Sequence, residues 1–146
     1  MERTFILLKP DAIKKGVVGE VISRLEKANL SIVGMKMLQL TEEMCREHYA
    51  HHVNKPFFQG LVKFMCSSAV ICMVLEGDGA VEKVRELAGP TDPKKAPKGT
   101  IRGDFGTDVQ VNIIHASDSK DTAEVELRRF FRDDEIFHRI GSFTKK

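Results

Sequence analysis

Cysteines are few in this sequence, and their spacing suits neither a disulfide framework nor a zinc ribbon. Cys45, Cys66 and Cys72 are odd in number, and no two of them form a C-x-x-C pair. Small secreted domains held by disulfides and zinc ribbons both depend on closely paired cysteines. Three unpaired thiols fit a reducing compartment, so we expect a cytoplasmic protein.

Long apolar runs and an excess of one charge are also missing. The first apolar run stops at Pro10 and Asp11, too early for the core of a signal peptide. The longest, AVICMVL at residues 69–75, is far too short to span a bilayer. With 23 basic and 21 acidic residues, charge alone does not indicate a nucleic-acid partner. We expect no membrane association and no nucleic acid as the primary partner.

The composition that remains is that of an ordinary globular protein. Hydrophobic residues make up 42% of the sequence and charged residues 30%. The 146 residues are enough for one hydrophobic core, and the chain contains no internal repeat or linker. We therefore expect a single domain over residues 1–146.

Four apolar runs predict β-strands. They lie at residues 4–9, 31–40, 69–77 and 109–116. The run TFILLK at 4–9 has no polar alternation, which is typical of a strand buried on both faces.

Five further stretches predict helices, at residues 17–30, 41–52, 57–65, 79–89 and 121–131. Thr41 can cap the second of them, and Gly89 can close the fourth. Asp121 with Glu124 three residues later suits a capping box at the start of the last. Residues 90–106 contain three prolines and no apolar period, so we expect a long functional loop there.

This order of elements predicts an α+β fold. The simplest arrangement is a four-stranded antiparallel sheet of the ferredoxin-like, split β-α-β type, with helices over one face and additional helical pieces. A parallel doubly wound sheet is the alternative.

A histidine ends the last predicted strand. Regular alternation would place His115 on the same face of the strand as Val109, Val111 and Ile113. Taken alone, this position suits a histidine that forms a hydrogen bond within the core. Glu126, however, falls at the rim of the apolar stripe of the following helix and could reach the end of that strand. A carboxylate on one ring nitrogen would fix the tautomer and leave the other nitrogen nucleophilic.

Such an imidazole can accept a phosphoryl group only if other groups neutralise the phosphate oxygens. Lys9, Arg85, Thr91 and Arg102 stand at the ends of predicted elements or in the long loop, where sites on mixed folds are usually built. The sequence has no G-x-x-x-x-G-K-[ST] pattern, which excludes a P-loop ATPase.

Several motifs together resemble those of the nucleoside diphosphate kinase family. NIIHASD at 112–118 matches the family's Asn-x-x-His-Gly-Ser-Asp signature, with Ala116 in place of glycine. LLKPDA, EHYAHHVNKPFF and GPTDPKKAPKGTIRGDF are similar to other stretches of the family, in the same order. Lys98 departs from the pattern by separating Pro97 from Gly99, so we expect a local change of loop geometry. Residues 138–146 match no motif.

The resemblance implies a role for each residue that it covers. His115 would be the phosphoryl acceptor, Glu126 its orienting partner and Ser117 a support for both. The phosphates would be bound by Lys9, Tyr49, Arg85, Thr91 and Arg102, with His52 nearby. The sugar hydroxyls would be held by Lys9 and Asn112, and the base would lie between Phe57 and Val109.

The resemblance also implies the activity and the partners. The γ-phosphoryl group of a nucleoside triphosphate, typically ATP, would pass to a nucleoside diphosphate by a ping-pong mechanism with broad base specificity. Mg²⁺ would bridge the nucleotide phosphates and would not need a cage of protein ligands. Self-association is expected, as a hexamer more than a tetramer.

Two other classes of function compete with this one. A split β-α-β sheet could bind RNA, although these strands lack the aromatic RNP pattern. His48 and His52, four residues apart, could share a structural zinc ion if both lay on one helix.

Overall fold

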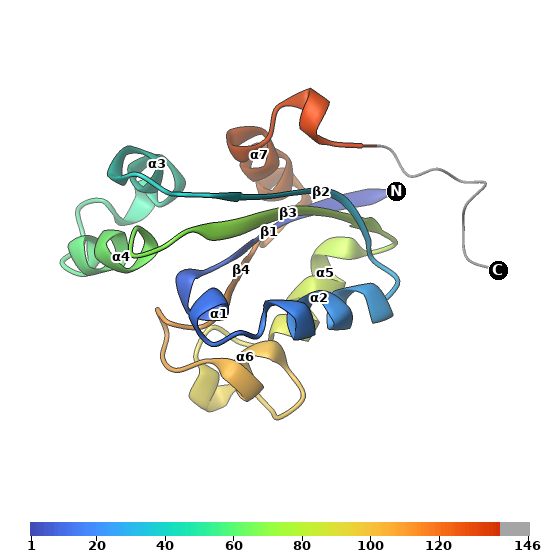
Figure 1. Cartoon of the computed structure of the whole chain (residues 1–146), viewed down its shortest axis with the longest axis horizontal. Coiled ribbons are helices and arrows are strands. Elements are labelled where there is room, and N and C mark those ends of the chain that lie inside the picture. Colours follow the sequence, from blue (N-terminus) through green and yellow to red (C-terminus); the bar gives the residue numbers. More distant parts are fainter. Residues whose placement is uncertain (138–146) are drawn as a thin grey trace.

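The fold was analysed from a computed structural model that describes residues 1–137. A four-stranded sheet with the order β2-β3-β1-β4 forms its centre (Figure 1). The strands are β1 (Glu2–Leu8), β2 (Ser31–Leu38), β3 (Val70–Gly77) and β4 (Ile114–Ala116). Every neighbouring pair is antiparallel, which confirms the predicted α+β sheet and makes the parallel alternative wrong.

The helices are α1 (Pro10–Lys14), α2 (Val18–Lys27), α3 (Glu42–His48), α4 (Phe58–Met65), α5 (Ala80–Ala88), α6 (Ile101–Phe105) and α7 (Lys120–Phe130). Short 3-10 turns occur at Ala50–His52, Pro93–Lys95 and Asp133–Glu135. Within residues 1–137, no helix has the length and apolar character needed to cross a membrane.

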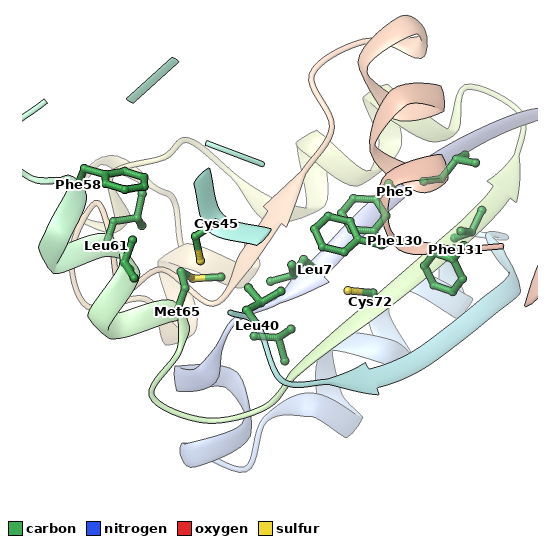
Figure 2. Packing of buried hydrophobic residues seen from close by; sticks show 14 of the residues in the cluster. Phe5, Leu7, Leu40, Cys45, Phe58, Leu61, Met65, Cys72, Phe130 and Phe131 are labelled. Atoms are coloured by element: carbon green, nitrogen blue, oxygen red, sulfur yellow. The ribbon is translucent and has the colours of Figure 1, made fainter. Parts of the chain in front are cut away.

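Both faces of the sheet are covered. On one face, Phe5 and Leu7 of β1 pack with α3, α4 and α7, including Phe130 (Figure 2). On the other, Ile6 and Leu8 pack with α2 and α5. The expectation of helices over one face was wrong because a central strand that is apolar on both sides needs a cover on both.

The last predicted strand is much shorter than its sequence suggested, which corrects the prediction of a strand over 109–116. The Asp108 carboxylate accepts hydrogen bonds from the backbone N–H groups of Gln110 (2.9 Å) and Val111 (2.8 Å) and folds this segment into a turn. Ile113 then has a φ of 79°. Regular alternation fails as a result: Val109 is exposed, whereas Ile113 is fully buried.

The region predicted as a loop over 90–106 contains a short helix. The Thr100 hydroxyl accepts a hydrogen bond from the N–H of Gly103 (3.0 Å) and thereby caps α6. Gly103 is required by close packing, since a Cβ there would clash with the carbonyl oxygen of Pro97. Periodicity cannot reveal a helix of five residues that contains a glycine.

Two helix ends also differ from their predictions. The N-cap of α7 is Ser119 and not Asp121, because the Ser119 hydroxyl accepts a hydrogen bond from the N–H of Thr122 (3.1 Å). The helix predicted over 41–52 ends at His48, with Thr41 as its cap. Pro10, expected only to stop the first strand, also opens α1, where its missing N–H costs nothing.

Candidate active site

A cavity of about 1240 Å³ opens where β1, β4, the region after α3 and the segment 89–102 meet. Nearly all residues to which the resemblance gave a role line it. They are Lys9, Tyr49, His52, Phe57, Arg85, Thr91, Arg102, Val109, Asn112, His115 and Glu126. Ser117 is the exception: it is fully buried and does not line the cavity, and its hydroxyl donates a hydrogen bond to Glu126.

His115 and Glu126 form the pair expected from the helix periodicity. The Nε2 of His115 lies 2.9 Å and 3.0 Å from the two carboxylate oxygens of Glu126. Burial favours the neutral acid, but the hydrogen bonds from His115 and Ser117 outweigh it and hold the pKa of Glu126 below its usual value. An ionised Glu126 keeps the proton of His115 on Nε2, so Nδ1 retains the lone pair of a nucleophile.

His48 is part of this cluster and was not expected there. Its ring meets that of His115 edge-on, with centroids 4.7 Å apart, and its Nδ1 accepts a hydrogen bond from the Arg129 guanidinium (2.8 Å). Burial, with smaller effects from His115 and Arg129, lowers the pKa of His48 to about 3, so the ring is neutral near pH 7. Its Nε2 therefore carries the hydrogen and has no partner within the described chain.

Lys9 and Asn112 are joined in the lining of the cavity. The Lys9 ammonium donates to the Asn112 side-chain oxygen (2.7 Å). Burial, together with the charge of Arg102, lowers the pKa of Lys9 to about 8. The amide group of Asn112 donates to the carbonyl oxygens of Thr91 (2.9 Å) and Val109 (3.2 Å), which ties the loop to the segment before β4.

The cationic end of the cavity is rigid. Arg102 donates to the carbonyl oxygens of Gly89 (2.8 Å) and Ile114 (2.7 Å). Burial and the nearby Arg85 lower the pKa of Arg102 to about 10, which leaves this guanidinium charged near pH 7, and its charge acts on Lys9. A fixed group of cations of this kind suits a ligand with several negative charges.

Apolar side chains also line the cavity. Phe57 is 48% exposed and Val109 59% exposed, and both line the cavity. The His52 ring packs edge-on against Phe57 with centroids 5.1 Å apart. Tyr49 is half-buried with its hydroxyl oxygen enclosed, and this desolvation raises the pKa of the hydroxyl and keeps it protonated.

The extra Lys98 leaves the site intact. Gly99 adopts a φ of 99° beside it, and its N–H donates to the Asp104 carboxylate (2.9 Å), which also pairs with Arg24 (2.8 Å). Thr91 and Arg102, on either side of this turn, line the same cavity. A local change of loop geometry at Lys98 stays a prediction, and both flanking site residues keep their place in the cavity lining.

One group of possible metal ligands lies within residues 1–137. Donor atoms of His48, His115 and Glu126 lie within 4.8 Å of one another, whereas His52, expected to pair with His48, is outside this group. The reason is that α3 ends at His48, so the helical spacing does not extend to His52. The cations around the group disfavour a resident metal ion, but the carboxylates of Asp118 and Asp121 line the same cavity and could meet an ion that arrives with phosphates.

Comparisons with known proteins all point to the family whose motifs the sequence resembles. The family model described as nucleoside diphosphate kinase matches residues 2–136. The chain is 55% identical over 136 residues to the nucleoside diphosphate kinase of Archaeoglobus fulgidus, covering 93% of this chain and 90% of that one. It is 53% identical over 139 residues to the enzyme of Pyrococcus abyssi, covering 93% and 87%.

Solved structures agree with this. A nucleoside diphosphate kinase of Halobacterium salinarum in complex with CDP superposes with a TM-score of 0.92 at 47% identity, covering 95% of this chain and 93% of that one. The Aquifex aeolicus enzyme gives a TM-score of 0.88 at 44% identity, covering 92% and 98%.

Proposed function

Since the chain belongs to the nucleoside diphosphate kinase family and is therefore a phosphotransferase, we propose that His115 carries the phosphoryl group between its two nucleotide substrates. The observation that carries this proposal is the pairing of His115 with an ionised Glu126 at the wall of a cavity with a cationic end. A nucleophile and the charges that its phosphate substrate needs thus share one site.

In the first half of the reaction, the Nδ1 lone pair of His115 attacks the γ-phosphorus of the nucleoside triphosphate. The N–P bond forms as the bond from phosphorus to the β-γ bridging oxygen breaks, and the nucleoside diphosphate leaves with that electron pair. The ring gains positive charge, which Glu126 stabilises through the Nε2–H hydrogen bond. In the second half, an oxygen of a different diphosphate attacks phosphorus, and the N–P bond breaks.

The cationic end binds the phosphates during both halves. Lys9, Arg85 and Arg102 would neutralise the phosphate oxygens, with the hydroxyls of Thr91 and Tyr49 as further donors. The loss of one such preorganised donor commonly costs about 10²- to 10³-fold in rate. The His48 Nε2–H is one more donor close to His115.

The nucleoside would lie toward Phe57 and Val109. Asn112, with Lys9, would bind the ribose hydroxyls, while Phe57 and Val109 would enclose the base, with His52 beside Phe57. Every base offers a π-face to an aromatic ring, so such contacts accept all bases. We expect comparable turnover with ADP, GDP, CDP and UDP as acceptors in a coupled assay.

Mg²⁺ would be held by the nucleotide phosphates, with Asp118 and Asp121 as the nearest candidate carboxylates of the cavity lining. When bound, it would neutralise the charge of the transferred group.

We also propose that the chain works in the cytoplasm as a homo-oligomer, as a hexamer more than a tetramer. Cys45, Cys66 and Cys72 are free thiols, as expected in a reducing compartment. The edge strand β2 presents Met35 and Met37, 47% and 60% exposed, which provides apolar surface for association. Light scattering would give the particle mass.

Labelling tests the proposed function directly. With γ-³²P-ATP and Mg²⁺, the protein should acquire a phosphate that is labile in acid and stable in alkali, and His115→Ala should abolish it. His51→Ala is the matched control, because it removes an exposed histidine that has no proposed role, and should still be labelled. Full labelling of His115→Ala would overturn the proposal.

A further inference from the structure

The turn before the proposed nucleophile is strained. Ile113 is β-branched and fully buried, and its φ of 79° lies in the left-handed region that such residues avoid. The N–H of Ile114 donates to the carbonyl oxygen of Asn112 (2.9 Å), so Ile113 is the central residue of a three-residue turn. Strain of this kind costs about 1–3 kcal/mol and persists only where neighbouring groups enforce it.

Asp11 supplies one of the enforcing contacts. Its carboxylate oxygen Oδ2 accepts a hydrogen bond from the N–H of Ile113 (3.0 Å), and both groups are buried. The carbonyl oxygen of Ile113 accepts from the N–H of Lys9 (2.8 Å). Both backbone polar groups of the strained residue are therefore held by residues on either side of Pro10.

The position of Asp11 is costly in itself. Its residue is 4% exposed, and its Oδ1 has no partner within residues 1–137. Burial raises the pKa of this carboxyl, while the hydrogen bond from Ile113 lowers it. Burial of a carboxylate with one unpaired oxygen is unfavourable for folding, so a contribution to stability alone does not explain this residue.

The turn connects groups to which the proposed function gives different tasks. Asn112 directly precedes Ile113, and its side-chain oxygen accepts a hydrogen bond from Lys9. His115 follows Ile113 by two residues. Between them, the carbonyl oxygen of Ile114 accepts a hydrogen bond from Arg102. A change of backbone direction at Ile113 would turn the ribose site and the nucleophile relative to each other.

We propose that Asp11 is a positioning residue, whose carboxylate holds Ile113 in the left-handed conformation that sets the directions of Asn112 and His115. This inference rests on the proposed role of His115. The competing explanation is that Asp11 only stabilises the first turn of α1, where an acidic side chain is favourable.

Two conservative variants separate these explanations. Asp11→Asn keeps an oxygen that can accept the Ile113 N–H but loses the charge. Asp11→Glu keeps the charge at the start of α1 but moves the acceptor by one methylene. We expect the single-turnover rate of phosphoenzyme formation at saturating ATP to fall at least tenfold in Asp11→Glu and to stay within about threefold of the parent in Asp11→Asn.

The stability of each variant is measured in parallel. Glu20→Ala is the matched control, because it removes a first-turn carboxylate from α2, and it should change stability without changing the rate. Should Asp11→Glu fail to fold, a comparison of Asp11→Asn with Asp11→Ser takes its place, because both lose the charge at the start of α1 but only asparagine keeps an acceptor at the distance of the Ile113 N–H.

The outcomes are distinguishable. The positioning role would be overturned if the parent is labelled and Asp11→Glu forms the phosphoenzyme as fast as the parent. It would also be overturned if the rates of both variants only follow their folded fractions. A parent protein that takes no label would overturn the proposed function and this role with it.

Discussion

At the residue scale, the cavity keeps one side chain ionised and a neighbouring one neutral. Glu126 keeps its charge because His115 and Ser117 donate to it, whereas His48 loses its charge because it is buried beside Arg129. Both residues lie next to His115. The proposed nucleophile thus has one charged neighbour that fixes its tautomer and one neutral neighbour that can donate to a phosphate.

The neutral state of His48 predicts acid sensitivity. The pKa of His48 is about 3 in the folded protein and about 6.5 in the unfolded chain, so unfolding takes up a proton once the pH is below about 6.5. Stability should therefore decrease as the pH falls from 7 to 5, by about 1–2 kcal/mol from this group. Urea unfolding at both pH values measures it.

A substitution isolates the contribution of His48. The groups that face it are His115, Glu126, Arg129 and Lys9, and they remain in His48→Gln, which should lose most of the difference between pH 7 and pH 5. The same substitution at the exposed His51 serves as the control. An unchanged pH dependence in His48→Gln would contradict the prediction.

The sequence was sufficient for some of these residues and not for others. His115 and Glu126 were predicted together because helix periodicity places Glu126 at the rim of a stripe. His48 was assigned to a different cluster, since its actual neighbours come from β4 and α7, which no local pattern connects to α3. Contacts between distant elements depend on tertiary packing that spacing does not reveal.

At the element scale, the shortest pieces determine the site. The strand β4 has three residues and α6 has five, yet they carry His115 and Arg102. The bounds of β4 were predicted wrongly, and α6 was predicted as a loop, because hydrogen bonds accepted by the Asp108 and Thr100 side chains override the apolar pattern. The long elements β1, β3 and α5 were predicted well, since burial of a whole face repeats along the sequence.

The corrected start of α7 can be tested by stability. Ser119→Ala removes the hydroxyl that accepts from the Thr122 N–H and should lower the free energy of unfolding by about 1 kcal/mol. Asp121→Ala, at the position that the sequence favoured, removes only a first-turn charge and should cost a few tenths of a kcal/mol. Denaturant unfolding of both variants measures the difference. A larger loss of stability in Asp121→Ala than in Ser119→Ala would identify Asp121 as the cap.

At the scale of the whole molecule, the cavity joins segments from across the chain. Lys9 follows β1, Arg85 belongs to α5 and Arg102 to α6, and the two helices lie on the same side of the sheet (Figure 1). A ligand that bridges these segments binds the folded state alone, so it should oppose global unfolding.

This predicts stabilisation by a substrate. ADP with Mg²⁺ at about 100 times its Kd should raise the free energy of unfolding by about 2.7 kcal/mol. His115→Ala should keep this effect, because a diphosphate does not need the nucleophile to bind. Arg102→Ala should lose most of it at the same ADP concentration, and a full effect in that variant would place the phosphates elsewhere.

The strand order has a consequence for synthesis of the chain. β1 is made first, but it lies between β3 and β4, whose pairings with it connect residues such as Leu7 to Cys72 and to His115. At about 5–20 residues per second, its apolar run waits on the order of 5–20 s for the last of these partners. The nascent chain must therefore keep this buried strand away from other molecules until nearly all of the domain has emerged from the ribosome.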